Sequence, residues 1–142
     1  MIEINREKDQ LPKISVVVPV LNMAKYIERT LDSIIRQRYP NFEVIIQDGG
    51  STDKTVEIIK QFAKRYPKII KWKSEKDRGQ YEALGRGFKR ATGTLLTFIN
   101  GDDYYQTDAL IKVGRAFQKN KHTLWLAGQG KVVDERGHQF AH

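Results

Sequence analysis

An apolar stretch that stops abruptly at two adjacent carboxylates constrains the fold more than any other part of this sequence. The stretch is residues 95–99, and Asn100, Gly101, Asp102 and Asp103 follow it directly. An apolar run with β-branched and aromatic members predicts a strand that is buried on both faces. Ligands of open α/β sheets bind at the carboxyl ends of the strands, which is where the two carboxylates fall.

The two carboxylates can do different jobs, because side chains alternate across an extended backbone. Two hard oxygen donors suit Mg²⁺ or Mn²⁺, which keeps several waters and shares the phosphates of a substrate. In the alternative interpretation, Asp102 and Asp103 only form a turn and cap the following helix. The pair alone leaves both readings open.

Strand and helix patterns alternate along the chain, which predicts an α/β fold with a mostly parallel sheet flanked by helices. In the third expected helix we place Leu84, Phe88 and Ala91 on the inward face. We expect Pro19 to end the first strand, because proline cannot donate to a sheet ladder. The expected strands are residues 14–19, 42–47, 69–73, 95–99 and 123–127, and the expected helices are residues 24–37, a segment carrying Val56, Ile59, Phe62 and Ala63, then residues 79–91 and about 107–118.

Composition and missing motifs exclude several classes of site. The 142 residues include no cysteine, which excludes disulfides, zinc–thiolate sites and cysteine nucleophiles. No G-x-G-x-x-G follows the first strand, and no G-x-x-x-x-G-K-[ST] or G-x-S-x-G motif occurs. The site must therefore be an α/β site of another kind.

The charge pattern and the N-terminus bear on partners and location. The net charge is +8, but its lysines and arginines are scattered over nearly every expected helix, so we expect a solvated surface and no nucleic-acid partner. The alternative is attraction to anionic lipids or phosphorylated substrates. The N-terminus is polar, and the longest apolar stretch, residues 14–21, is too short to span a membrane. We expect a cytoplasmic protein, with the inner face of the membrane as the alternative location.

Polar residues follow each expected strand in turn, and these motifs resemble those of family 2 glycosyltransferases of the GT-A fold. The resemblance covers roughly residues 13–130 and depends on the order of the motifs, since each one alone is weak. The motifs are Val18-Pro19-Val20-Leu21-Asn22, residues 47–55 (Gln47 to Thr55), residues 74–83 (Ser74 to Ala83), Ala91-Thr92-Gly93, and Asn100-Gly101-Asp102-Asp103.

The resemblance implies a Rossmann-like GT-A fold in truncated form. Residues 1–12 would be an N-terminal extension, and residues 13–142 a nucleotide-sugar-binding domain whose acceptor-binding half, with its general base, is missing. The implied reaction is metal-assisted, inverting transfer of a sugar from a nucleotide-diphosphate donor, expected to be a UDP-sugar. The acceptor would be the hydroxyl of a glycan or lipid-linked molecule in surface polysaccharide synthesis. The alternative is a catalytically incomplete nucleotide-sugar-binding module that needs a partner or the missing half.

The resemblance also implies a role for each site residue. In the family's DXD-like motif the last Asp binds the metal, which assigns Asp103 to Mg²⁺ or Mn²⁺ and Asp102 to the nucleotide sugar. Asp48 would contact the base, Pro19 and Asn22 would shape the nucleoside pocket, and Asp77 and Arg78 would lie beside the diphosphate or donor sugar.

Each of these roles has a simpler alternative. Asp48-Gly49-Gly50 can form a tight turn, with Ser51, Thr52 or Asp53 capping the next helix. Asp77 can be a loop carboxylate paired with Arg78. Gly85 stands where relatives often carry Asn, which removes one contact to the donor sugar. Because an acceptor-binding half would cover part of the sheet, we also expect an exposed apolar patch and a homo-oligomer.

Overall fold

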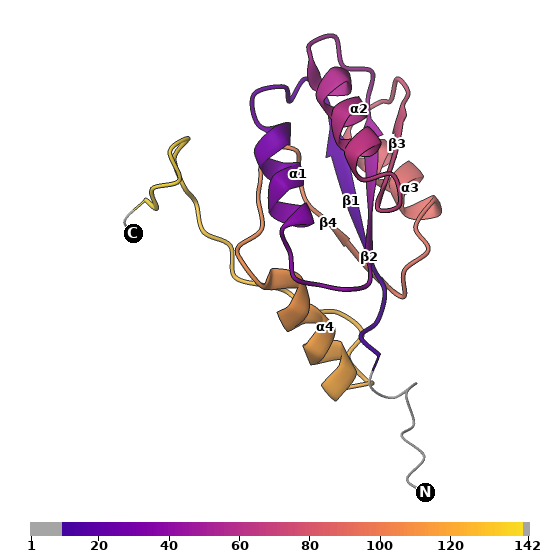
Figure 1. Ribbon diagram of the computed structural model, residues 1–142, viewed down its shortest axis with the longest axis vertical. Coiled ribbons are helices and arrows are strands. Elements are labelled where there is room, and N and C mark those ends of the chain that lie inside the picture. The colour runs from indigo at the N-terminus through magenta and orange to yellow at the C-terminus, as the bar shows by residue number, and fades with distance from the viewer. Residues whose placement is uncertain (1–9, 141–142) are drawn as a thin grey trace, which may run out of the picture.

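The computed structural model describes residues 10–140, and its centre is a parallel sheet of four strands in the order β3-β2-β1-β4 (Figure 1). Every neighbouring pair of strands is parallel. The α/β prediction is therefore confirmed, while most of the expected N-terminal extension lies outside the described residues. The strands are β1 (Ile14–Val20), β2 (Phe42–Asp48), β3 (Ile70–Ser74) and β4 (Leu95–Phe98).

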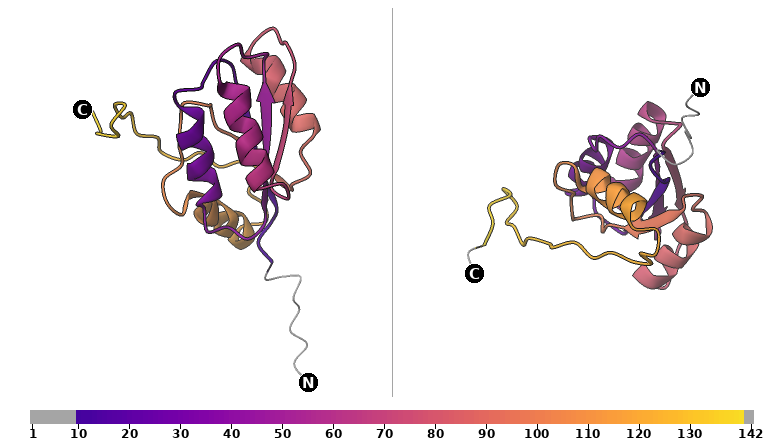
Figure 2. Two further views of the ribbon diagram at one scale, coloured as in Figure 1. Left: turned by 45° about the horizontal axis from the view of Figure 1, so that its top comes forward. Right: turned by 90° about the horizontal axis from the view of Figure 1, so that it is seen from below.

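Helices cover both faces of the sheet. In the views of Figures 1 and 2, α1 and α2 lie on one face, α3 lies on the other, and α4 lies near the end where the strands begin. Within residues 10–140, no helix is both long and apolar enough to cross a membrane. The helices are α1 (Ile27–Ile35), α2 (Thr55–Arg65), α3 (Gln80–Lys89) and α4 (Ala109–Lys119).

The two central strands are buried on both faces. All seven residues of β1 are buried, which explains its continuous apolar run. Alternate residues such as Val16 and Val18 join Ile27 and Leu31 of α1 in the main core. Val17 points the other way, toward α3. The sheet therefore separates two packed layers, and its carboxyl edge is left to the loops.

The third helix packs on the sheet through small residues, and the predicted inward face of this helix is wrong. Ala83 and Gly87 are its buried positions, whereas Leu84, Phe88 and the following Ala91 are only half-buried. A Cβ on Gly87 would lie 2.4 Å from Val17 Cγ1. The close approach of the helix to β1 therefore selects small side chains where a sequence pattern favours large ones.

Strand β4 is correctly located in the sequence, but the prediction that it is buried on both faces is wrong. It is an edge strand, paired only with β1. Leu96 is 56% exposed and Phe98 is 48% exposed. An apolar run does not distinguish a central strand from an edge strand whose outer face lacks a covering layer.

The predicted strand at residues 123–127 is not formed. This segment is extended but unpaired, and Leu124 and Trp125 are 92% and 78% exposed. After α4 the chain runs away from the domain body (Figure 2), and Glu135 forms an ion pair with Lys25 at 2.5 Å. β-propensity alone therefore does not form a strand here, because residues 123–127 pair with neither edge strand of the sheet, β3 or β4.

A buried carboxylate joins the beginnings of three strands. Glu43, which is 2% exposed, accepts hydrogen bonds from Ser15 Oγ (2.7 Å), Lys71 Nζ (2.8 Å) and the backbone N–H of Thr92 (2.7 Å). Burial would raise the pKa of the Glu43 carboxyl, but the hydrogen bonds from these partners outweigh it and hold that pKa far below its ordinary value. Glu43 is therefore a charged structural anchor at the edge opposite the candidate site.

Candidate functional site

All the site residues predicted from the sequence lie at or just beyond the carboxyl edge of the sheet. The strands end at Val20, Asp48, Ser74 and Phe98, and the loops that follow carry the remaining polar residues. In a parallel sheet these loops meet at one edge, where α/β proteins bind their ligands. The topology thus brings together residues that are up to 84 positions apart, from Pro19 to Asp103.

Pro19 lies within β1 and does not end it, so that prediction is wrong. The strand continues to Val20, and Pro19 is in register with Gln47 of β2. The carbonyl of Val17 accepts from Ile99 N–H on the β4 side, so odd-numbered backbone groups of β1 face β4. The pairing of β4 ends at Val17–Phe98, below Pro19. Pro19 therefore has no partner strand on the side where its N–H would point, and the sheet loses no hydrogen bond by having proline there.

The loops after β1 and β2 are joined through the side chain of Asn22. Asn22 adopts a left-handed backbone conformation with φ 51°, which short polar side chains tolerate. Its Oδ1 accepts from the backbone N–H of Thr52 at 2.8 Å, and its own N–H donates to Ser51 Oγ at 2.8 Å. Asn22 thus shapes this edge by fixing two loops against each other. The same interlock includes Met23 N–H to Thr55 Oγ1 (2.8 Å) and Ala24 N–H to Asp53 Oδ2 (3.1 Å).

Asp48 organises its own loop, as the tight-turn alternative predicted. Its carboxylate is fully buried, and Oδ2 accepts from Gly50 N–H (3.0 Å) and Ser51 N–H (2.9 Å). Ser74 Oγ donates to the same oxygen at 2.6 Å, and Ser51 Oγ donates to the other oxygen. Asp48 therefore links the ends of β2 and β3 and holds the wall of the site in place.

Asp53 is the residue that assists the start of α2. Its Oδ1 accepts from the backbone N–H of Thr55 at 2.9 Å, one of the helix's unpaired N-terminal donors. The hydrogen bonds from Thr55, first that of its side chain, lower the pKa of Asp53. The capping alternative is thus met only in part, because Asp53 bonds the first residue of α2 while the N-cap position itself is Lys54, which makes no side-chain cap hydrogen bond.

Asp77 lies against the β2 loop. Its Oδ1 accepts from Gly79 N–H at 2.9 Å. A Cβ built on Gly49 would come within 2.7 Å of Asp77 Oδ2, so the absence of a side chain at Gly49 makes room for this carboxylate. Arg78 is almost fully exposed and pairs with Glu82 at 3.3 Å, which contradicts the suggested pairing of Asp77 with Arg78. Asp77 therefore presents a carboxylate beside the buried Asp48 loop.

Asp102 and Asp103 are adjacent, exposed carboxylates in the turn after β4. The side-chain amide of Asn100 donates to Asp103 Oδ2 at 3.1 Å, and Gln80 at the start of α3 donates from its own amide to Asn100 Oδ1. Gly101 between them is buried, and a Cβ there would lie 2.7 Å from Val20 Cγ1. The turn therefore rests closely on the end of β1, with its carboxylates facing outward.

Asn100 and Gln80 belong to the site in the structure, although no sequence pattern marked them as site residues. Both lie within the motifs that carried the family resemblance, yet neither has a charge or a ligand pattern that would mark it. Their polar spacing at the ends of neighbouring elements was the only available signal. The structure shows that the two amides connect α3 to the Asp103 carboxylate.

The donor set at this turn fits a hard divalent cation that shares a diphosphate. Among residues 10–140, no three His, Cys, Asp or Glu side chains gather into a metal-binding group. Mg²⁺ and Mn²⁺ bound at phosphates usually take only one or two protein carboxylates, which Asp102 and Asp103 can supply. These residues fit a cation held jointly with a ligand.

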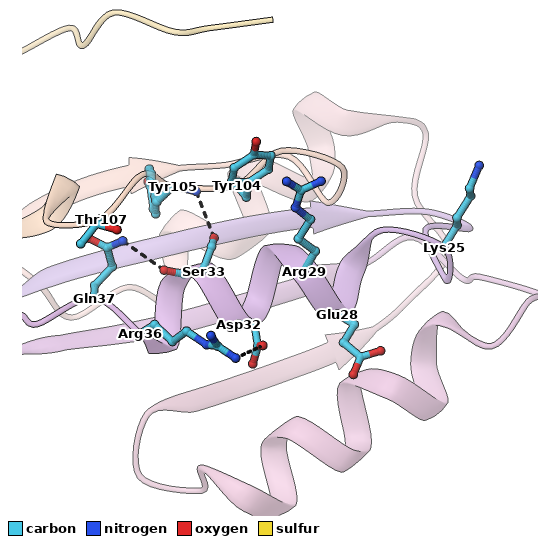
Figure 3. A pocket seen from close by; sticks show the side chains of 10 residues that line it. All are labelled: Lys25, Glu28, Arg29, Asp32, Ser33, Arg36, Gln37, Tyr104, Tyr105 and Thr107. Carbon is cyan, nitrogen blue, oxygen red and sulfur yellow. Dashed lines mark hydrogen bonds and ion pairs between the residues drawn. The ribbon is translucent and has the colours of Figure 1, made fainter. Parts of the chain in front are cut away.

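A separate groove lies beside this turn, between α1 and residues 104–107 (Figure 3). Its volume is about 530 Å³. The guanidinium of Arg29 lies over the Tyr104 ring at 3.9 Å, and Asp32 pairs with Arg36 at 3.0 Å. None of the predicted site residues lines the groove. The groove adjoins the aspartate turn through Tyr104 and Tyr105, which follow Asp103 directly in the chain.

Comparison with known proteins places this geometry in a family. Residues 15–142 match the family model for glycosyl transferase family 2. A Mycobacterium tuberculosis "PGL/p-HBAD biosynthesis glycosyltransferase" is 41% identical over 103 residues, which are 72% of this chain and 40% of that protein. An uncharacterised glycosyltransferase from Nostoc is 31% identical over 133 residues, 89% of this chain and 41% of that protein. The chain thus spans less than half of the length of these relatives.

Solved structures resemble the fold over a similar share. A mannosyltransferase from Pyrobaculum calidifontis, in complex with GDP-Man and Mn²⁺, has a TM-score of 0.69 and 29% identity. It matches 78% of this chain and 33% of that protein. Residues 1–349 of S. aureus TarS, in complex with UDP-GlcNAc, have a TM-score of 0.66 and 32% identity, over 78% of this chain and 32% of that one. The chain has the N-terminal part of a GT-A fold and belongs to glycosyltransferase family 2.

Proposed function

We propose that this chain is the donor-binding part of a glycosyltransferase and holds a nucleotide-diphosphate sugar, with a divalent cation, at the carboxyl edge of its sheet. The observation that carries the proposal is the exposed Asp102–Asp103 pair at the end of β4, beside loops fixed by Asp48 and Asn22. Such a site combines a rigid polar wall with carboxylates that are free to bind a cation. The bound ligands of the mannosyltransferase and of TarS support it.

In this proposal each residue has a defined part. Asp103 binds Mg²⁺ or Mn²⁺, and Asp102 contacts the sugar of the nucleotide. The cation, when bound, neutralises the diphosphate as the leaving group departs. Asp77 and Arg78 lie beside the diphosphate or the donor sugar.

The pocket for the nucleoside is formed by the ends of β1 and β2. Pro19 and Asn22 shape it, and Asp48 contributes through the loop that its four hydrogen bonds hold. Asp48 Oδ1 accepts a single hydrogen bond, from Ser51 Oγ, so it keeps a lone pair for a donor group of the base. We therefore assign Asp48 both to the wall of the pocket and to the base.

The finer chemistry follows the family resemblance. The donor is a UDP-sugar, the acceptor is the hydroxyl of a glycan or lipid-linked molecule, and transfer inverts the anomeric carbon. The mycobacterial relative, named for PGL/p-HBAD biosynthesis, supports a role in the synthesis of surface glycolipids or polysaccharides. Scattered basic side chains would favour contact with the anionic inner face of the membrane.

A second candidate function is a nucleotide-sugar-binding module that is catalytically incomplete. The chain spans about a third of the mannosyltransferase, so turnover by this chain has to be tested separately from donor binding. The discriminating measurement is release of free sugar or transfer from the donor by this chain alone. Donor binding without turnover supports the module, and turnover supports the enzyme.

The test of the proposed function is calorimetric titration of UDP into the protein with and without Mn²⁺. We expect Mn²⁺-dependent binding that Asp103→Asn abolishes. Asp32→Asn, which removes a carboxylate from α1, should leave the binding unchanged. GDP titrated in parallel tests the choice of base, since the solved relatives include one GDP-sugar and one UDP-sugar complex. If the affinity for UDP changed neither with Mn²⁺ nor with Asp103→Asn, the proposed site would be refuted.

A further inference from the structure

Helix α1 and the residues after it carry a line of polar side chains that face inward. Thr30 is 1% exposed and Gln37 is 6% exposed, and Ser33 between them is half-buried. Spacings of three and four residues place all three on one side of a helical path. Buried polar groups are costly unless they are hydrogen-bonded, so the partners of these three residues indicate why they are there. We call Thr30, Ser33 and Gln37 the α1 polar stripe.

Thr30 contacts the backbone on both sides of Asp102. Its Oγ1 lies 2.9 Å from the carbonyl oxygen of Gly101 and 2.6 Å from that of Asp103. Gly101 and Asp103 flank Asp102, and Asp103 is itself a member of the exposed carboxylate pair. A single hydroxyl group thus holds the turn in which both carboxylates sit.

The other two members of the stripe hold the next part of the same loop. The backbone N–H of Tyr105 donates to Ser33 Oγ at 3.0 Å, as Figure 3 shows. Gln37 donates from Nε2 to the carbonyl of Gln106 at 2.9 Å and accepts from the N–H of Leu110 at 3.1 Å. The side chains of the stripe therefore bind backbone groups spread over residues 101–110.

The loop depends on these contacts because it lies between regular elements. Residues 99–108 separate β4 from α4, and beyond the bond from Ile99 N–H to Val17 they are part of neither the sheet nor a helix. Backbone groups in such a segment need partners from elsewhere. Within residues 10–140, many of those partners come from α1, which is itself packed on the sheet through Ile27 and Leu31.

We infer that the α1 polar stripe positions Asp102 and Asp103 for the cation, and that Thr30 is its principal positioning residue. The inference rests on the proposed function, since it concerns the same carboxylates. A metal site tolerates little displacement of its ligands, and the partners that orient the ligands commonly affect metal affinity by 10- to 100-fold. Thr30 touches neither cation nor substrate and acts through the backbone of the turn.

The test compares Mn²⁺ affinity in the presence of UDP among matched variants. Thr30→Val keeps the shape of the side chain and removes its hydroxyl, so we expect Mn²⁺ affinity to fall about tenfold. Any UDP binding that remains without Mn²⁺ should change little, because the wall formed by the β1 and β2 loops is untouched. Thr30→Ser restores the hydroxyl and should recover most of the Mn²⁺ affinity.

A threonine at the opposite end of the sheet provides the control. Thr94 also donates its hydroxyl to a backbone carbonyl, that of Lys13 at 3.3 Å, and Thr94→Val should leave Mn²⁺ affinity unchanged. If Thr30→Val does not fold, Ser33→Ala takes its place, with an expected loss of several-fold. If these variants lose stability but keep their Mn²⁺ affinity, the α1 polar stripe has a structural role only.

The outcomes separate this inference from the proposed function. Wild-type protein that shows no Mn²⁺-dependent UDP binding overturns both. Wild-type binding that Thr30→Val and Ser33→Ala leave intact overturns the positioning role alone. Loss in Thr30→Val that Thr30→Ser does not recover also overturns it, because the hydroxyl would then not be responsible.

Discussion

Asn100 donates a hydrogen bond from its side-chain amide to one carboxylate oxygen of Asp103, over 3.1 Å. Because Oδ2 is held in this way, Oδ1 is the oxygen left to face a cation. Asn100→Ala should therefore lower the affinity for Mn²⁺ in the presence of UDP by about tenfold, as measured by calorimetry. Gln80→Ala should have a smaller effect, since it acts on Asn100 alone. Asn120→Ala at the end of α4 is the control, and equal affinity of all these variants would contradict the role of Asn100.

Gly49 leaves room for the carboxylate of Asp77. Gly49→Ala would place a Cβ 2.7 Å from Asp77 Oδ2 and force that side chain to move. We expect UDP affinity to fall about tenfold, equivalent to about 1.4 kcal/mol, with little change in melting temperature. Gly85→Ala, where a Cβ meets nothing within 4 Å, should bind UDP normally. Unchanged affinity in Gly49→Ala would show that the place of Asp77 does not matter for binding.

Two glycines of α3 should respond to alanine in opposite directions. Gly85 has open space around its Cβ position, so Gly85→Ala should raise the free energy of unfolding by about 0.5–1 kcal/mol through helix propensity. Gly87→Ala would place a Cβ 2.4 Å from Val17 Cγ1 and should lower it by about 1–3 kcal/mol. Urea unfolding measures both. Equal effects of the two substitutions would rule out close packing of α3 on β1.

Glu43 should make stability depend on pH in the acid range. Its pKa in the folded protein lies below the ordinary value of 4.5, so its stabilising effect is complete above about that pH and is lost as the pH falls toward the folded pKa. Glu43→Gln should lower the free energy of unfolding at pH 7 by about 1–3 kcal/mol. It should also flatten the decline below pH 4.5. Glu57→Gln on the exposed face of α2 is the control. If the free energy of unfolding of Glu43→Gln depended on acid pH as that of the parent protein does, Glu43 would not be a charged structural anchor.

The exposed edge of β4 should promote self-association. Leu96 and Phe98 leave about half of their surface exposed beside an unpaired strand edge. We expect a dimer or larger species by light scattering at high concentration, and a monomer when both residues are replaced by lysine, which protects strand edges. Leu124→Lys in the extended segment serves as the control. A monomeric parent protein at high concentration would contradict this prediction.

The fold could be predicted from the sequence where local pattern and tertiary environment agree. The strands β1 and β2 have continuous apolar runs because both faces are covered, and α1 shows helical spacing of its buried residues. The errors arise where the environment differs from the pattern. Leu96 and Phe98 are apolar on an uncovered face, and residues 123–127 have β-propensity without a partner strand. Gly87 is buried because of a close approach that no single-sequence pattern reveals.

The candidate site, like the fold, could be predicted from the sequence only in part. The positions of Asp48, Asp77, Asp102 and Asp103 follow from where strands end, and topology then brings them to one edge. Hydrogen-bond partners do not follow from position. That Asp48 is enclosed by its own loop, and that Thr30 holds the turn at Asp102, depends on contacts between segments far apart in the chain.

The order of strands in the sheet also has a consequence for synthesis of the chain. β1 lies between β2 and β4, yet β4 is the last of the four strands to leave the ribosome. Because domains generally fold as units during synthesis, the sheet cannot be completed until β4 has emerged. Until then the second edge of β1 has no partner strand, and an unpaired strand edge is a template for pairing with other chains. The emergence of β4 both covers this edge and adds the aspartate turn.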